Sequence, residues 1–257
     1  MAAAVRRWAG HIGWPLLGFA VALGLWAAGA RQLSDVEAIR DAFSPQAGLA
    51  AWWRLLVDGS LWDHITISLQ RIFIALGVAL AVGVPLGVLL GMSPLFARIS
   101  GTVFQFLRMV SPLSWMPLAV MALGVGEAPV VFLLAFAAVW PVMLNTAAGV
   151  AALDPAWLRL AASLSATRWE VVTRVVLPGI VTHVLTGFRL AVGIGWIVLV
   201  PAEMLGVSAG MGYFILDTRD RLAYDELTAG ILTIGVLGFA LDALARFLSR
   251  RWTHARA

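Results

Sequence analysis

The sequence contains no cysteine and no lysine, and each absence removes a class of chemistry. Without cysteine there is no disulfide framework, no thiolate metal site and no cysteine nucleophile. Every basic residue is an arginine, which excludes a Walker A phosphate loop and Schiff-base catalysis, because both require a lysine. We therefore expect that the chain does not bind and hydrolyse ATP through a phosphate loop of its own.

Charged residues are also scarce. They make up 12% of the 257 residues, whereas hydrophobic residues make up 61%, and the mean hydropathy is +0.91. Since soluble domains contain about a quarter charged residues, this chain has too little polar surface to cover a soluble globule. Its arginines are scattered between apolar stretches, so the sequence favours a membrane protein over a nucleic-acid-binding one despite an isoelectric point near 10.9.

Six stretches are apolar and long enough to be transmembrane helices, each of which needs about 20 residues. They cover residues 12–30, 65–92, 101–124, 128–150, 186–205 and 227–247. The first can also be interpreted as a secretory signal that is cleaved after Ala28-Gly29-Ala30, but its apolar run is longer than usual for a signal, so we favour a retained span. The sequence predicts an all-α membrane protein with six transmembrane helices, or five after cleavage.

The distribution of arginine predicts the orientation of these spans. If the N-terminus is cytoplasmic, most of the arginines between spans fall on the cytoplasmic side, as the positive-inside rule requires. Both termini are then cytoplasmic. Between the first two spans, Trp52, Trp53 and Trp62 stand among polar residues, and we expect a partly helical segment on the outer surface there, because indole rings favour the headgroup level.

Small residues and prolines suggest how the spans pack. Two stripes with four-residue spacing would let helices approach closely, although glycine is common in membrane helices in any case; they are Gly83, Gly87 and Gly91, and Gly187, Ala191 and Gly195. Proline kinks or breaks a helix where the freed carbonyl groups line protein or water. The prolines expected to act in this way are Pro85, Pro112, Pro117, Pro141 and Pro201.

A polar interruption lies between the fourth and fifth spans. Asp154-Pro155 favours the start of a short helix that runs to about Leu164. The T-x-x-E spacing from Thr167 to Glu170 predicts a capping box and a second helix, which we expect to stop before Pro178. Both helices have apolar faces, so this cytoplasmic element either lies on the membrane surface or inserts into a groove of a partner protein.

The interruption resembles the cytoplasmic "EAA" loop of permease subunits of binding-protein-dependent ABC importers. Its ending Val175-Val176-Leu177-Pro178 is similar to the Ile-x-Leu-Pro ending of that loop, and Ala161 and Leu164 match. Arg159 and Ser165 depart from the pattern, since they stand where a glutamate and a turn-forming glycine are expected. Other stretches resemble the nitrate, sulfonate, taurine and bicarbonate branch: Ser68-Leu69-Gln70-Arg71, Arg189-Leu190-Ala191, Ala202-Glu203-Met204-Leu205, Gly210-Met211-Gly212-Tyr213 and the run from Gly230 to Gly235.

The resemblance implies a type I ABC importer permease fold in a bacterial inner membrane. Residues 1–64 would form the first helix and the outer segment, 65–250 the permease core and 251–257 a cytoplasmic tail. The implied partners are separate ATPase subunits that bind ATP, a second permease, and a periplasmic or lipoprotein solute-binding protein. For the second permease we favour a copy of this chain over a different chain. The solute would be a small anion or zwitterion, and we expect no enzymatic activity, cofactor or metal.

The resemblance also implies which residues couple the permease to its ATPase. They are Arg159, Ala161, Ala162, Ser163, Leu164, Ser165, Ala166, Thr167 and Arg168. Polar or kink-flanked residues in the spans are candidates for the solute pathway, each weighed against an ordinary interfacial or packing role. They are Arg108, Trp115, Met116, Asn145, Arg189 and Glu203. Arg108 would attract an anion, and Trp115 with Met116 forms either an apolar gate or simple packing.

Two alternative classes remain open at this point. A secondary transporter or channel would carry its own coupling, usually with ionisable groups at the midplane and an inverted repeat; here the ionisable residues cluster at span ends and no repeat is visible. A membrane enzyme would need a nucleophile, a metal cluster or an acid–base pair, and none assembles in the sequence. The lone His183 has no second ligand at metal-binding spacing.

Overall fold

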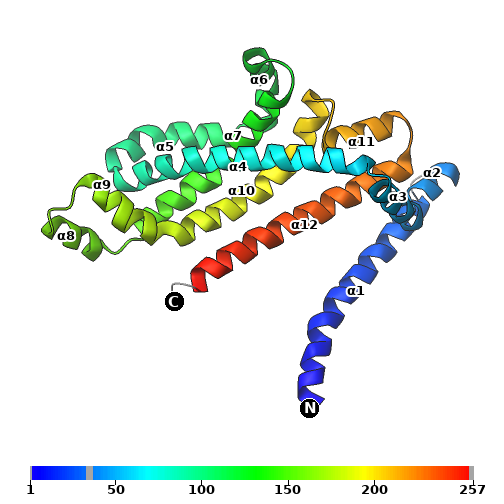
Figure 1. Ribbon diagram of the computed structural model, residues 1–257, viewed down its shortest axis with the longest axis horizontal. Helices are drawn as coiled ribbons and strands as arrows, with labels where there is room; N and C mark the ends of the chain where they lie inside the picture. The colour runs from blue at the N-terminus through cyan, green and yellow to red at the C-terminus, as the bar shows by residue number, and fades with distance from the viewer. Residues whose placement is uncertain (1, 33–36, 255–257) are drawn as a thin grey trace. The chain divides into compact units, whose positions relative to one another are not determined.

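The computed structural model describes residues 2–32 and 37–254, and every regular element in these ranges is a helix (Figure 1). Residues 33–36 of the predicted outer segment and residues 255–257 of the predicted tail lie outside the described residues. The chain divides into two compact units. One contains residues 63–213 and 235–257, and the other contains residues 1–62 and 214–234.

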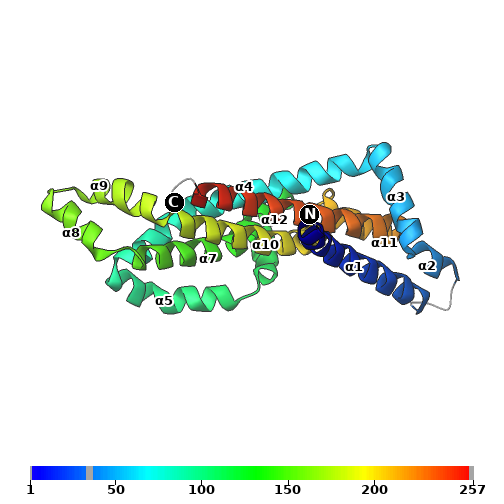
Figure 2. The ribbon, with the colours of Figure 1, turned by 90° about the horizontal axis from the view of Figure 1, so that it is seen from below.

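The larger unit is built on long apolar helices. They are α4 (Ser60–Met92), α7 (Glu127–Ala151), α10 (Leu177–Gly206) and α12 (Tyr224–His254), of which residues 235–254 belong to this unit. These helices, drawn in Figures 1 and 2, contribute apolar side chains to one core, and Ile72, Val142 and Leu241 are among its members. Each of these helices is long and apolar enough to cross a membrane, which confirms four of the predicted spans.

Small residues bring α4, α7 and α10 together. A Cβ atom added at Gly87 of α4 would lie 2.5 Å from the carbonyl oxygen of Met143 in α7, and one at Gly187 of α10 would lie 2.8 Å from the carbonyl oxygen of Pro141. Gly83 likewise abuts Val142. The close approach predicted from both stripes is confirmed, because there is no room at these positions for any side chain.

The third predicted span, residues 101–124, is broken near Pro112, where the sequence predicted a kink or a break. The chain forms α5 (Pro94–Met109), a 3₁₀ turn η1 (Pro112–Trp115) and α6 (Met116–Leu123), and the two halves are bent by 93°. Pro112 lacks an N–H and disfavours helical geometry in the residue before it, and Ser111 is extended with ψ 130°. The other candidate prolines do not interrupt helices: Pro117 lies in the first turn of α6, and Pro85, Pro141 and Pro201 lie within helices.

Between α7 and α10 the chain forms α8 (Pro155–Ser163), α9 (Arg168–Glu170) and a π-helical segment η2 (Val171–Val176). The smaller unit contains α1 (Ala2–Gln32), α2 (Glu37–Ala42), α3 (Pro45–Val57), most of α11 (Met211–Asp220) and the first turns of α12. The helical character predicted for the segment between the first two spans is confirmed. Within this unit, the indole of Trp52 in α3 donates to Thr233 Oγ1 at 3.0 Å.

The glycine packing predicts a clear contrast between two substitutions in α4. Gly87→Ala should destabilise the protein by about 1–3 kcal/mol, because its methyl group would press on the backbone of α7. Gly77→Ala should be neutral or stabilising by up to about 1 kcal/mol, because nothing lies within 4 Å of the added atom and alanine favours a helix. Thermal unfolding of the detergent-solubilised variants measures both effects, and equal midpoints would contradict the packing.

Candidate coupling loop and translocation cleft

The first part of the candidate coupling loop is a capped helix followed by a tight turn. The Asp154 side chain accepts the Ala156 N–H at 2.8 Å and begins α8 as predicted. After α8 ends, Ser165 adopts φ +54°, in the left-handed region, and Ala166 N–H donates to the carbonyl of Ala161 at 3.0 Å. Serine therefore makes the turn for which a glycine was expected.

The predicted capping box is present at the second helix. Glu170 N–H donates to Thr167 Oγ1 at 3.3 Å, and Thr167 N–H donates to the Glu170 carboxylate at 2.9 Å. The prediction that this helix stops before Pro178 is wrong, because α9 continues through η2 into α10 and residues 168–206 form one helical run. The π-helical segment changes the hydrogen-bond pattern just ahead of Pro178, so the missing N–H of the proline does not end the helix.

Most of the predicted coupling residues are solvent-exposed. Leu164 is 73% exposed and Ala161 is buried, while Ala166 is half-buried. The exposed ones are Arg159, Ala162, Ser163, Leu164, Ser165, Thr167 and Arg168. Figure 1 shows α8 and α9 at one end of the larger unit, beyond the ends of α7 and α10. A cleft of about 670 Å³ lies against α8, and Ala161, Leu164 and Arg174 help to line it.

Two of the six pathway candidates lie together in a second cleft. This cleft of about 370 Å³ is formed by the end of α5, by α7 and by α10, and Arg108 and Asn145 line it together with Trp140. Arg108 Nη2 donates to the amide oxygen of Gln105 at 2.7 Å, and Asn145 Nδ2 donates to the carbonyl of Pro141 at 2.8 Å. Within the described part of the chain, no carboxylate pairs with Arg108 and no acceptor receives the buried N–H of Trp140.

The other pathway candidates do not line this cleft. Met116 is buried in a core cluster, and the ring of Trp115 lies 5.6 Å from that of Phe136. Both positions fit the packing role better than the gate. Arg189 is exposed, and its Nε donates to Asp242 of α12 at 3.1 Å.

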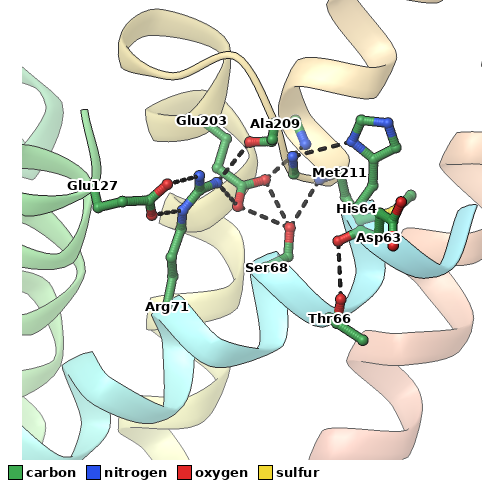
Figure 3. Close-up of polar contacts among 11 residues, drawn as sticks. Asp63, His64, Thr66, Ser68, Arg71, Glu127, Glu203, Ala209 and Met211 are labelled. Atoms are coloured by element: carbon green, nitrogen blue, oxygen red, sulfur yellow. Dashed lines mark hydrogen bonds and ion pairs between the residues drawn. The ribbon is translucent and has the colours of Figure 1, made fainter. Parts of the chain in front are cut away.

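Glu203, the sixth candidate, lies in a buried network of charged and polar groups (Figure 3). Its side chain is 0% exposed and that of Arg71 is 2% exposed. Arg71 Nη1 donates to Glu203 Oε1 at 2.6 Å, Ser68 Oγ donates at 2.8 Å, and the N–H of Gly212 donates to Oε2 at 2.8 Å. The carboxylate is thus held by α4 and by the start of α11, and it lines neither of the two clefts described above.

The network also includes the start of α7 and the loop after α10. The other side of the Arg71 guanidinium binds both carboxylate oxygens of Glu127, with Nη2 at 2.6 Å from Oε1. Arg71 Nη1 donates to the carbonyl of Ala209 at 2.8 Å, and Gly210 N–H donates to His64 Nδ1 at 3.1 Å. One arginine therefore ties together four segments of the larger unit.

Sequence reasoning missed Trp140 and Glu127 and noted Arg71 only as part of a similarity. A signal for Arg71 was available, because it is the only charged residue between Ile65 and Met92, and an ionisable group within a span is a functional candidate. Its partners could not be assigned, since they lie 56 and 132 residues away in the sequence.

Removing the buried arginine should cost far more stability than removing an exposed one. Arg71→Ala leaves the Glu203 carboxylate buried and unpaired and should destabilise the protein by about 3–5 kcal/mol. Arg189→Ala breaks an exposed ion pair and should cost less than about 1 kcal/mol. Unfolding of both variants in the same detergent measures the difference, and similar losses would argue against the importance of the buried pair.

Comparison with known proteins places these features in a family. Residues 83–254 match the family described as "Binding-protein-dependent transport system inner membrane component". The chain is 37% identical to the taurine transport system permease protein TauC of Escherichia coli K12, over 77% of this chain and 72% of that protein. It is 31% identical to the nitrate import permease protein NrtB of Leptolyngbya laminosa, over 91% of this chain and 85% of that protein. It is 32% identical to the bicarbonate transport system permease protein CmpB of Synechococcus elongatus, over 76% of this chain and 70% of that protein.

Solved structures show the same fold at low sequence identity. An inward-facing structure of the MetNI methionine ABC transporter contains a chain with a TM-score of 0.64 and 15% identity, covering 77% of this chain and 98% of that one. A crystal structure of an amino acid ABC transporter with histidines contains a chain with a TM-score of 0.59 and 17% identity, covering 78% of this chain and 98% of that one. With most of its length matched by the family and by these relatives, the chain belongs to the inner membrane components of binding-protein-dependent transport systems.

Proposed function

We propose that this permease carries a small oxyanion or zwitterion and is driven through residues 154–178 by separate ATPase subunits. Its family makes it the membrane-spanning, non-enzymatic subunit of an ABC importer that depends on a binding protein. The observation that carries the proposed solute class is the cleft around Arg108, whose guanidinium has no carboxylate partner among the described residues.

The cleft is suited to a small solute with negative oxygens. Arg108 supplies a cation, and the guanidinium group matches planar or tetrahedral oxyanions with paired donors. Among the described residues, no acceptor receives the buried N–H of Trp140, and an unsatisfied donor of this kind favours a site that a ligand completes. A volume of about 370 Å³ lies within the usual range for small-molecule sites. The relatives named for taurine, nitrate and bicarbonate support the same class.

The exposed end of α8 is suited to docking on an ATPase. Trp157, Leu160 and Leu164 present apolar surface, and a short amphipathic helix of this kind fits a hydrophobic groove. Arg159 and Arg168 flank this surface and are exposed, so they can pair with an acidic rim around the groove. Because residues 168–206 form one helical run, a pull on α8 would pass directly into α10.

The topology completes the proposal. Four helices meet the criteria for a span, the bent α5–α6 pair can supply a fifth crossing, and the apolar residues 17–30 of α1 support a sixth. The arginine distribution supports cytoplasmic termini. We further propose that residues 1–64 form an N-terminal segment, residues 65–250 the permease core and residues 251–257 a tail. The permease would form a homodimer. A periplasmic or lipoprotein binding protein would deliver the solute.

The docking role predicts the effect of a charge on α8. Leu164→Asp should leave the protein inserted in the membrane but reduce co-purification of the ATPase about tenfold or more, because it places a carboxylate in an apolar contact. Leu222→Asp is a matched control, since Leu222 is also exposed but lies between α11 and α12. Normal assembly and uptake in Leu164→Asp would contradict the docking role. Uptake that continues after deletion of the ATPase would instead indicate a secondary transporter or channel.

The cleft predicts the effect of removing its cation. Arg108→Ala should raise the KM for uptake of the anionic solute about tenfold or more in reconstituted vesicles, because a charge-assisted contact is lost. Arg98→Ala removes an exposed arginine from the same helix without touching the cleft and should leave KM unchanged. If both variants behave alike, Arg108 is not a pathway residue.

A further inference from the structure

We propose that Arg71 is part of a second oxyanion site and that Glu127 is a built-in ligand which a small oxyanion displaces. The physiological ligand would belong to the solute class proposed above, so the identity of the ligand rests on the proposed function. The site would lie in the first half of α4, since the 21 helical steps from Arg71 to the last residue, Met92, span about 30 Å.

The two carboxylates that bind Arg71 differ in environment. Glu203 is fully buried and accepts hydrogen bonds from Ser68 and Gly212 in addition to Arg71. Glu127 is 64% exposed, and Arg71 is its only ion-pair partner among the described residues. One side of the guanidinium is therefore fixed to a buried carboxylate, whereas the other side is covered by a carboxylate that water can reach.

The segment before Glu127 allows that carboxylate to move away. Gly124 and Gly126 have φ +82° and +127°, which residues with side chains rarely adopt, and nothing lies within 4 Å of a Cβ atom built at either position. Val125 between them is 86% exposed. The start of α7 is thus joined to α6 by two permissive residues in open space, and α7 is buried only from Pro129 onward. The side-chain hydrogen bonds that hold Glu127 among the described residues are those with Arg71.

The groups freed by this movement match an oxyanion. Nε and Nη2 of Arg71, which now bind the two oxygens of Glu127, form the parallel donor pair that carboxylate, nitrate, bicarbonate or sulfonate groups accept. The exchange also leaves the local net charge unchanged, because a monovalent oxyanion beside Arg71 and Glu203 would take the place of the Glu127 carboxylate. A chloride ion lacks the paired oxygens and would not replace Glu127 equally well.

A spin label placed at Val125→Cys tests the exchange in the purified transporter. The chain has no cysteine, so this variant carries one labelling site beside Glu127. We expect saturating nitrate to increase label mobility, and chloride at equal ionic strength to leave it unchanged. Glu127→Gln should mobilise the label without any anion, whereas Glu226→Gln, which alters two ion pairs that do not involve Arg71, should not.

Arg71→Lys separates the paired donors from the charge. This substitution keeps a cation beside Glu203 but removes the parallel donor pair. It should raise the nitrate concentration that gives half-maximal mobility of the label about tenfold or more. If neither nitrate nor Glu127→Gln changes the mobility of the label, the proposal is overturned. If binding protein without anion increases the mobility of the label but nitrate does not, the proposal is also overturned. That result would indicate that the donor pair of Arg71 binds a carboxylate of the binding protein. The label reports nitrate binding whichever solute is transported, so it is independent of the uptake result for Arg108→Ala.

Discussion

The ion pair between Arg71 and Glu203 is the interaction on which the arrangement of the larger unit depends. An arginine and a glutamate are both buried in a protein with few charged residues, and burying such a pair is costly unless each group finds several partners. The network meets that requirement with hydroxyl, backbone and carboxylate groups from α4, α7, the loop after α10 and α11. Satisfying one buried arginine therefore fixes the relative positions of segments that are distant in the sequence.

Close helix packing connects this network to the opposite end of the unit. Gly87 and Gly187 allow backbone contact of α7 with α4 and with α10, and α10 is continuous with the π-helical segment and α9. Densely packed helices move as rigid bodies rather than bending independently. The helices that line the cleft around Arg108 and those that carry the Arg71 network are in direct backbone contact.

The break at Pro112 shapes the cleft around Arg108. Residues 101–124 do not form one straight helix. Instead the 93° bend places Arg108 in the last turn of α5, at the edge of a cleft of about 370 Å³. The irregular backbone lies next to the cleft, where irregular structure is tolerated within a membrane.

The sequence by itself determined the membrane class, four of the spans, the caps at Asp154 and Thr167, and the glycine packing stripes. These features depend on composition or on residues within about one helical turn of each other. Only the tertiary structure decided the partners of Arg71 and the grouping of Arg108 with Trp140 and Asn145. It also decided the continuation of α9 into α10. The physical reason is that buried charges and clefts are completed by groups far apart along the chain, 132 residues in the case of Arg71 and Glu203, and no local pattern encodes which distant groups will meet.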